Sequence, residues 1–200
     1  MCTIYLNIHV SELDLSASQP QLSAQRRDYL HFFRREEDKR AVAAAWLLLC
    51  RALRERYAIS EPPRLAFGSH GKPFLADYPH IYFNLSHSRD AAVCAVDTRP
   101  VGIDVETTEA YDPALLTTTM NDEEIRSILS DEHPDQAFLR LWTRKEAFLK
   151  YLGTGITDDL RDILLHPALA PLHLQTFAPR TEQYICSLCA EGESMECIFT

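Results

Sequence analysis

Hydrophobic residues recur along this chain with two different periods, which together predict an α+β fold. Spacing close to that of a helix predicts helical segments over residues 23–57, with a break near 34–38, and over 121–130 and 134–152. Short runs rich in β-branched and aromatic residues predict strands. The predicted strands cover residues 4–10, 65–68, 80–85, 91–97, 101–106, 163–165, 172–177, 183–189 and 195–199.

The order of these elements predicts two halves, residues 1–100 and residues 101–200. Each half offers a helical segment and about three strands, and Arg99-Pro100 marks the junction between them. A chain of 200 residues is long enough for one large domain or for two small packed halves. The pattern indicates a structural duplication, although the two halves share no obvious sequence identity.

Charge is distributed unevenly between the two halves. The formal net charge of −9 argues against general nucleic-acid binding, because that function needs a basic surface. Residues 1–100 contain 13 Lys and Arg against 11 Asp and Glu, whereas residues 101–200 contain 7 against 18. The first half therefore suits an anionic small ligand, and the second half suits a metal ion.

Neither a membrane span nor a leader sequence is predicted. The chain has no run of about 18 apolar residues, and its first residues lack a basic segment followed by an apolar one. We therefore expect a cytoplasmic protein whose six cysteines are small buried hydrophobes. The sulfurs of the lone CxxC pair, Cys186 and Cys189, would point to opposite faces of a strand, which argues against a zinc site.

Two acidic residues occupy alternate positions of the strand predicted over 101–106. Asp104 and Glu106 would project from one face, while Val101, Ile103 and Val105 would project from the other into the core. Neighbouring carboxylates repel each other, and a shared hard cation such as Mg²⁺ removes the repulsion. The pattern is that of a metal site or, alternatively, of a solvated strand edge with alternating charges.

A second set of charges lies on the helix predicted over 134–152. Glu146 and Lys150 are four residues apart and share a face with Trp142. The pair is either part of a functional site or an ordinary surface ion pair, which contributes a few tenths of a kcal/mol, on the order of 0.3.

Three segments of the first half could hold an anion. Phe83–Ser88 follows a predicted strand, so it is an anion-binding turn or a polar hairpin loop. Lys72, fixed between Gly71 and Pro73, could hold a phosphate or belong to a plain surface turn. The basic run over 26–40 could supply one or two phosphate contacts or form a solvated helix face.

Taken together, these segments resemble the Sfp-type 4′-phosphopantetheinyl transferases, which activate carrier proteins. The segment Gly102-Ile-Asp104-Val-Glu106 matches that family's G-(I/V)-D-x-E strand, and Trp142-Thr-Arg144-Lys145-Glu146-Ala-Phe-Leu-Lys150 matches its W-(S/T)-x-K-E-(A/S)-x-x-K helix. The upstream segments Gly71-Lys72-Pro73 and Asn84-Leu-Ser86-His87-Ser88 match its G-K-P and N-x-S-H-S elements. The order and spacing are kept over residues 26–156.

The resemblance implies a fold of two similar α+β halves related by pseudo-twofold symmetry, with coenzyme A bound in the cleft between them. It implies Mg²⁺-dependent transfer of the 4′-phosphopantetheine arm from coenzyme A to a serine of an apo carrier protein, releasing 3′,5′-ADP. The carrier could be an acyl, peptidyl or polyketide carrier. A monomer is implied, because both halves belong to one chain.

The resemblance also implies roles for single residues. Asp104, Glu106 and Glu146 would hold Mg²⁺, and Glu146, Lys150 and Asp104 would be catalytic, with Glu146 the base directly or through a metal-bound water. Coenzyme A would be bound by Arg40, Lys72, Pro73, Ser86, His87, Lys145 and Lys150, with His87 near the 3′-phosphate. Arg26 or Arg27 could replace the lysines with which the family holds that phosphate. Leu115, Leu116 and Met120 would form an apolar docking patch for the carrier or belong to the core.

Two alternatives stay open beside the transferase. An inactive relative would bind coenzyme A or a carrier protein without turnover. A different Mg²⁺-dependent phosphotransferase or phosphatase would use the same three acids, but the chain has no P-loop motif.

Overall fold

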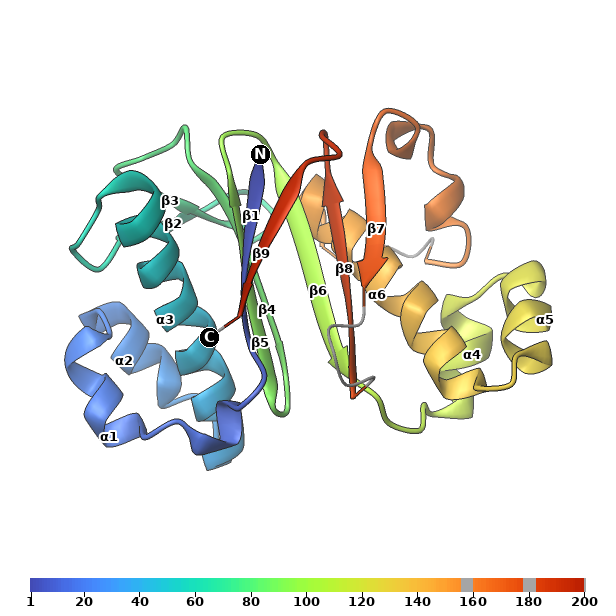
Figure 1. Cartoon of the computed structure of the whole chain (residues 1–200). Helices are drawn as coiled ribbons and strands as arrows, with labels where there is room; N and C mark the ends of the chain where they lie inside the picture. Colours follow the sequence, from blue (N-terminus) through green and yellow to red (C-terminus); the bar gives the residue numbers. More distant parts are fainter. Residues whose placement is uncertain (156–159, 178–182, 200) are drawn as a thin grey trace.

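Two β-sheets packed face to face form the centre of the molecule (Figure 1). The computed structural model describes residues 1–155, 160–177 and 183–199. The first sheet has the strand order β4-β5-β1-β9 and the second has the order β6-β8-β7. The strands of the first sheet are β1 (Cys2–Asn7), β4 (Tyr82–Ser88), β5 (Ala91–Asp97) and β9 (Met195–Phe199), and those of the second are β6 (Val101–Thr107), β7 (His173–Phe177) and β8 (Tyr184–Ala190).

Helices cover the outer faces of both sheets. The long helix α3 (Glu36–Tyr57) packs on the first sheet and α6 (Pro134–Leu152) packs on the second (Figure 1). Shorter helices lie around them: α1 (Leu15–Ser18) and α2 (Ala24–Leu30) beside α3, and α4 (Pro113–Thr119) and α5 (Asp122–Ser130) near α6. A small hairpin, β2 (Leu65–Phe67) with β3 (Pro73–Leu75), adjoins the first sheet. The predicted α+β content is confirmed.

The core between the sheets comes from alternate residues of facing strands. Ile4 and Leu6 of β1 meet Val101, Ile103 and Val105 of β6 in one buried cluster. The predicted inward face of the strand over 101–106 is therefore confirmed. A second cluster fills the space between α3 and the first sheet. Four layers result: helix, sheet, sheet and helix.

Long periodic elements agree best with the sequence-based prediction. The helix over 134–152, the strand over 91–97 and the strand over 195–199 have the predicted bounds. The helix α5 begins with a capping box, in which Asn121 and Glu124 satisfy each other's backbone amides. The helix α6 ends at Gly153, which adopts a left-handed conformation with φ 72°.

Two predicted elements are wrong. Ile163–Leu165 is a short 3₁₀ helix and not a strand, because three apolar residues are too few to show a period. Ser86, His87 and Ser88 belong to β4 and not to a turn that follows it. The hairpin turns only afterwards, at Arg89, whose φ is 34°.

The predicted division at residue 100 and the predicted twofold relation between the halves stay predictions. One strand crosses between the two ranges: β9, from the end of the chain, pairs in parallel with β1 in the first sheet. Among the described helices, none combines the length and the apolar character needed to cross a lipid bilayer.

Candidate active site

Strands β4 and β6 lie side by side but belong to different sheets, and polar side chains connect them. The Asn84 Oδ1 accepts a hydrogen bond from the backbone amide of Ile103 at 2.8 Å. The Ser86 hydroxyl donates to Asp104 Oδ1 at 2.7 Å. The joint between the sheets therefore places a hydroxyl of the first sheet against a carboxylate of the second.

A second hydrogen bond of the same kind, from a serine of β4 to a carboxylate of β6, lies two residues further along both strands. The Ser88 hydroxyl donates to Glu106 Oε2 at 2.7 Å. Because side chains alternate along a strand, residues 84, 86 and 88 project from the same face of β4. The sequence predicted Asn84 and Ser88 only as part of a polar turn, although their alternate spacing with Ser86 is the period of a strand.

Gly102 allows α6 to approach β6 closely. A Cβ atom at this position would lie 2.0 Å from the carbonyl oxygen of Ala147 and 2.3 Å from the amide nitrogen of Tyr151. Both are backbone atoms, so a side chain cannot be accommodated unless the helix moves. The glycine therefore lets α6 bring Glu146 and Lys150 next to the acidic residues of β6.

The Lys150 ammonium lies among the three predicted acids. Its Nζ is 2.5 Å from Asp104 Oδ1 and 3.0 Å from Ser86 Oγ. Burial lowers the pKa of Lys150, but the charges of Asp104, Glu146 and Glu106 outweigh it and leave that pKa raised. The structure thus brings the predicted catalytic residues together.

Burial also changes the acids themselves. It raises the pKa of Glu106 to about 7, with the charge of Asp104 acting in the same direction. It raises the pKa of Glu146, which Lys150 partly offsets. Buried carboxylates with raised pKa values are typical of functional sites, since a buried negative charge needs a partner.

Two buried carboxylate oxygens of this cluster have no hydrogen-bond partner among the residues that the structure describes. They are Oδ2 of Asp104 and Oε1 of Glu146. Carboxylate oxygens are the ligands that Mg²⁺ prefers in proteins, so the donor set fits that ion. Within the described part of the chain, no three such side chains are gathered as a ready-made metal site, and the Lys150 ammonium pairs with Asp104.

Two adjoining cavities open beside this cluster and share Gly71, Pro73 and Leu85 in their walls. One, of about 310 Å³, is lined by Lys72, Glu146 and Lys150. The other, of about 300 Å³, is lined by residues of α2 and α3 and by His87. Together they offer room for an elongated ligand that reaches from the first half to the acidic residues.

Of the two arginines predicted to hold the 3′-phosphate, Arg26 lines the cavity of about 300 Å³ and Arg27 does not. The Arg26 guanidinium lies 5.2 Å from the ring centroid of Tyr29 and 4.7 Å from that of Trp46, and all three line the cavity. The Arg27 side chain turns away and donates to the carbonyl oxygens of Gln19 and Leu22. Of the two, Arg26 is therefore the residue available to a ligand.

The side-chain nitrogens of Lys72 and Arg40 differ in their hydrogen-bond partners. The Lys72 Nζ donates to the carbonyl oxygens of Val101 and Tyr151 at 3.3 and 3.0 Å. Burial lowers the pKa of Lys72 to about 8. The Nε of Arg40 is buried without a hydrogen-bond partner. Lys72 thus fastens the turn to β6 and α6, while Arg40 keeps an unused donor.

Lys145 does not join the site, which corrects the prediction that it lies near the phosphates. Its side chain is 0% exposed, and its Nζ lies 2.6 Å from Glu124 Oε2. It also donates to the carbonyl oxygens of Thr119, Leu160 and Arg161 at 2.8 to 2.9 Å. Successive helix residues point about 100° apart, so Lys145 leaves α6 on a different side from Glu146.

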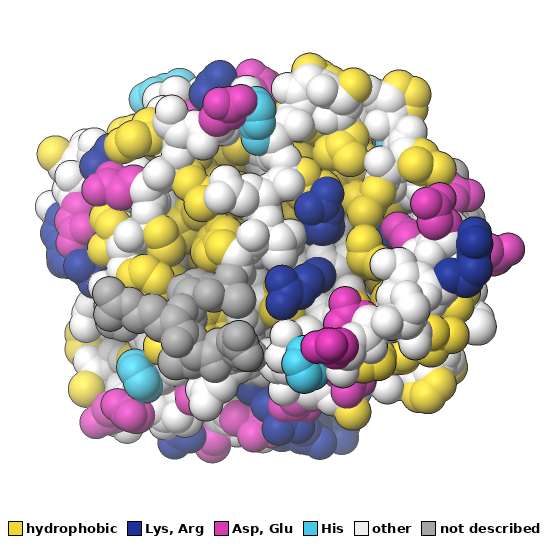
Figure 2. Space-filling view, turned by 45° about the vertical axis from the view of Figure 1, so that its right-hand side comes forward, with side chains coloured by type: hydrophobic (Ala, Val, Ile, Leu, Met, Phe, Trp, Pro, Cys, Tyr) yellow, Lys and Arg dark blue, Asp and Glu magenta, His cyan; other side chains and the backbone are white. Residues whose placement is uncertain are grey.

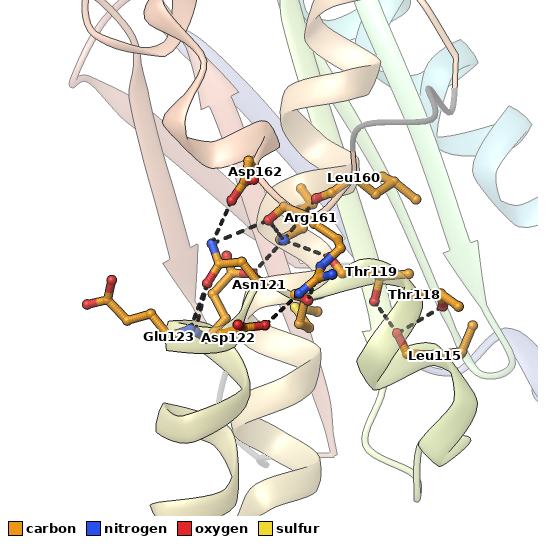
Figure 3. Close-up of polar contacts among 12 residues, drawn as sticks. Leu115, Thr118, Thr119, Asn121, Asp122, Glu123, Leu160, Arg161 and Asp162 are labelled. Atoms are coloured by element: carbon orange, nitrogen blue, oxygen red, sulfur yellow. Dashed lines mark hydrogen bonds and ion pairs between the residues drawn. The ribbon is translucent and has the colours of Figure 1, made fainter.

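Further polar contacts join the start of α5 to residues 160–162 (Figure 3). Asn121 donates to Asp162 Oδ1 at 3.2 Å, and Arg161 pairs with Asp122 at 2.6 Å. These bonds connect the start of α5 to the segment around residue 161. Lys145 therefore holds three chain segments together and leaves no hydrogen available for a ligand.

The predicted docking patch is largely core. Met120 and Leu116 are buried in a cluster with Phe138 and Ile128, and only Leu115 is exposed, at 40%. The alternative that these residues belong to the core holds for two of the three.

Charge on the molecular surface is mixed. Among the described residues of the face in Figure 2, Lys and Arg side chains form small groups near Asp and Glu, with hydrophobic side chains exposed between them. This face lacks the continuous basic surface that nucleic-acid binding requires.

Comparison with known proteins shows which proteins this chain is similar to. A family model described as the 4′-phosphopantetheinyl transferase superfamily matches residues 100–189. A 4′-phosphopantetheinyl transferase of Bacillus subtilis is 31% identical over 162 residues, which cover 78% of this chain and 71% of the relative. The 4′-phosphopantetheinyl transferase HetI of Nostoc sp. is 34% identical over 178 residues, covering 84% and 72%. The 4′-phosphopantetheinyl transferase psf-1 of Bacillus pumilus is 35% identical over 145 residues, covering 71% and 62%.

Proposed function

Because the chain belongs to the 4′-phosphopantetheinyl transferase superfamily and is a transferase, we propose that it transfers the 4′-phosphopantetheine arm of coenzyme A to a serine of an apo carrier protein and releases 3′,5′-ADP. The observation that carries the proposal is the cluster of Asp104, Glu106, Glu146 and Lys150, in which Glu146 and Lys150 line the cavity of about 310 Å³. Such a cluster suits transfer of a phosphoryl group, in which charge on the phosphate oxygens must be neutralised.

Residues of the first half would bind the nucleotide. Arg26 and His87 line the cavity of about 300 Å³, so their nitrogens are available to the 3′-phosphate. Pro73 lines both cavities, and Arg40 has an unused buried donor. Lys72 already bonds two carbonyl oxygens, so we assign it the positioning of the turn as well as contact with the ligand.

The carboxylates of Asp104, Glu106 and Glu146 would hold Mg²⁺, since two of their buried oxygens have no other partner. When bound, this ion neutralises charge on the pyrophosphate oxygens of coenzyme A. The Ser86 hydroxyl holds one oxygen of Asp104, which leaves the other oxygen free. We therefore assign Ser86 chiefly to the carboxylate and only secondarily to coenzyme A.

The transfer step needs a base for the carrier serine. Glu146 would accept the hydroxyl proton on one of its two carboxylate oxygens and face Mg²⁺ with the other, and its Oε1 has no hydrogen-bond partner among the described residues. The serine oxygen then bonds to the phosphorus that bears the pantetheine, and the bond from that phosphorus to 3′,5′-ADP breaks. The Lys150 ammonium would stabilise the charge that leaves with the nucleotide. A single chain suffices in this scheme, because one chain supplies both cavities and acids.

The test is to incubate the protein with an apo carrier protein, coenzyme A and Mg²⁺ and to weigh the carrier by mass spectrometry. We expect the carrier to gain one phosphopantetheine, with no gain after a chelator is added or in the Glu146→Gln variant. If no carrier gains mass although coenzyme A binds, the chain is an inactive relative. If coenzyme A does not bind and another phosphate ester is turned over, the acids serve a different phosphotransferase.

A further inference from the structure

The Ser88 hydroxyl is committed to Glu106 by its own hydrogen-bonding pattern. Its Oγ accepts from the backbone amide of Thr107 at 3.2 Å and lies 2.7 Å from Glu106 Oε2. In its ionised form, which is the form that binds a metal, the carboxylate can only accept, and a serine hydroxyl has a single hydrogen to donate. That hydrogen therefore points at Glu106, and the contact at 3.2 Å with Thr107 Oγ1 is left to the threonine to donate.

Glu106 is held from a second direction as well. The Trp142 side chain of α6 lies close enough to its carboxylate to favour the charged form. The side chains of Ser88, Glu106 and Trp142 all line a cavity of about 330 Å³ on the far side of the acidic cluster. Contacts from β4 and α6 therefore restrict the Glu106 side chain.

Ser86 makes the same kind of hydrogen bond as Ser88, to a carboxylate of β6, whereas Asn84 bonds the backbone of β6. Ser86 holds one oxygen of Asp104 and leaves the other without a partner, as expected where a ligand is to bind. Asn84, on the same face of β4, bonds the backbone of β6 instead. Asn84 can thus connect the two strands, while the hydroxyls orient the acids.

We propose that Ser88 is a positioning residue that orients Glu106 for Mg²⁺. The Ser88 hydroxyl, on the first sheet, then affects how tightly the acidic residues of the second sheet bind the metal. The inference rests on the proposed function, because only a metal-dependent transfer needs Glu106 as a ligand. Partners that orient metal-binding side chains typically change metal affinity by about 10- to 100-fold when removed. A bond that only joined the strands would change stability and leave the affinity unaltered.

The experiment measures Mn²⁺ binding by electron paramagnetic resonance on the whole chain saturated with coenzyme A. We expect Ser88→Ala to weaken Mn²⁺ binding about 10-fold or more, with coenzyme A affinity in chelator unchanged. Ser88→Thr, which keeps the hydroxyl, should bind Mn²⁺ like the wild type. Ser18→Ala is the matched control, since its hydroxyl donates to the backbone carbonyl of Asp14 on α1.

Two results would overturn the inference: Mn²⁺ affinity in Ser88→Ala equal to that of the wild type, or Ser88→Thr as weak as Ser88→Ala. If Ser88→Ala is too unstable to assay, Ser88→Cys keeps the side-chain volume with a weak donor and must show the same loss. Failure of the wild type to bind coenzyme A would instead refute the proposed function, and it would be seen before any metal is added.

Discussion

Replacing Lys145 with Met tests whether this lysine supports the fold or binds phosphate. The buried ammonium bonds the Glu124 carboxylate and three backbone carbonyl oxygens, and its side chain is 0% exposed. Methionine has a similar length but no donor. The substitution therefore leaves a carboxylate and three carbonyl oxygens without their partner.

The structure sets the size of the effect. Removing one member of a buried ion pair costs about 3–5 kcal/mol, because the remaining charge stays buried and unpaired. The Glu124 side chain is 13% exposed, so water can relieve part of that cost. With about 2–4 °C per kcal/mol for a chain of this size, we expect the melting temperature of Lys145→Met to fall by roughly 6–20 °C.

Thermal and urea denaturation followed by circular dichroism measure the loss, and steady-state kinetics below the new melting temperature give the KM for coenzyme A. We expect that KM to stay close to the wild-type value. Glu124→Gln is the companion variant, because glutamine keeps the capping bond to Asn121 while removing the charge. The double variant should lose less stability than the two single variants added together, by about 0.5–3 kcal/mol.

The opposite pattern would refute the structural role of Lys145. An unchanged melting temperature with a KM for coenzyme A raised tenfold or more, that is about 1.4 kcal/mol, would show that the ammonium contacts the ligand. Additive single variants would show that Lys145 and Glu124 do not act as a pair.

Three further predictions concern the first half and the contact with α6. Gly102→Ala should destabilise the protein by about 3 kcal/mol or more, because its Cβ would lie 2.0 Å from a helix carbonyl oxygen; Gly68→Ala, with its nearest atom at 3.7 Å, is the control, and equal melting temperatures would contradict the close approach. His87→Ala should raise the KM for coenzyme A more than the KM for 3′-dephospho-coenzyme A, whereas equal effects would remove the 3′-phosphate role. The pKa of Lys72, lowered by burial to about 8 from 10.5, means that the unfolded chain binds the extra proton between these pH values. The Lys72 contribution to stability therefore rises with pH across that window, and a constant difference in unfolding free energy between wild type and Lys72→Met would argue against it.

Local periods in the sequence determined several features of this protein. Alternation along β6 placed Asp104 and Glu106 on one face and Val101, Ile103 and Val105 on the other, and the buried cluster of the structure agrees. The helix α6 begins at Pro134 and ends before Gly153, as its boundary residues predict. Both results depend only on neighbours in the chain.

The tertiary structure decided what each of these faces meets. Helical spacing in the sequence puts Lys150 on the face of Glu146 and Lys145 about 100° away from it, but only the packing of α6 on β6 directs Lys150 to Asp104 and Lys145 to Glu124. Ser88 and Glu106 lie 18 residues apart in the chain, and only the joint between two separate sheets brings them to 2.7 Å. A period fixes which residues share a face, whereas the partner of that face depends on packing between segments far apart in the sequence.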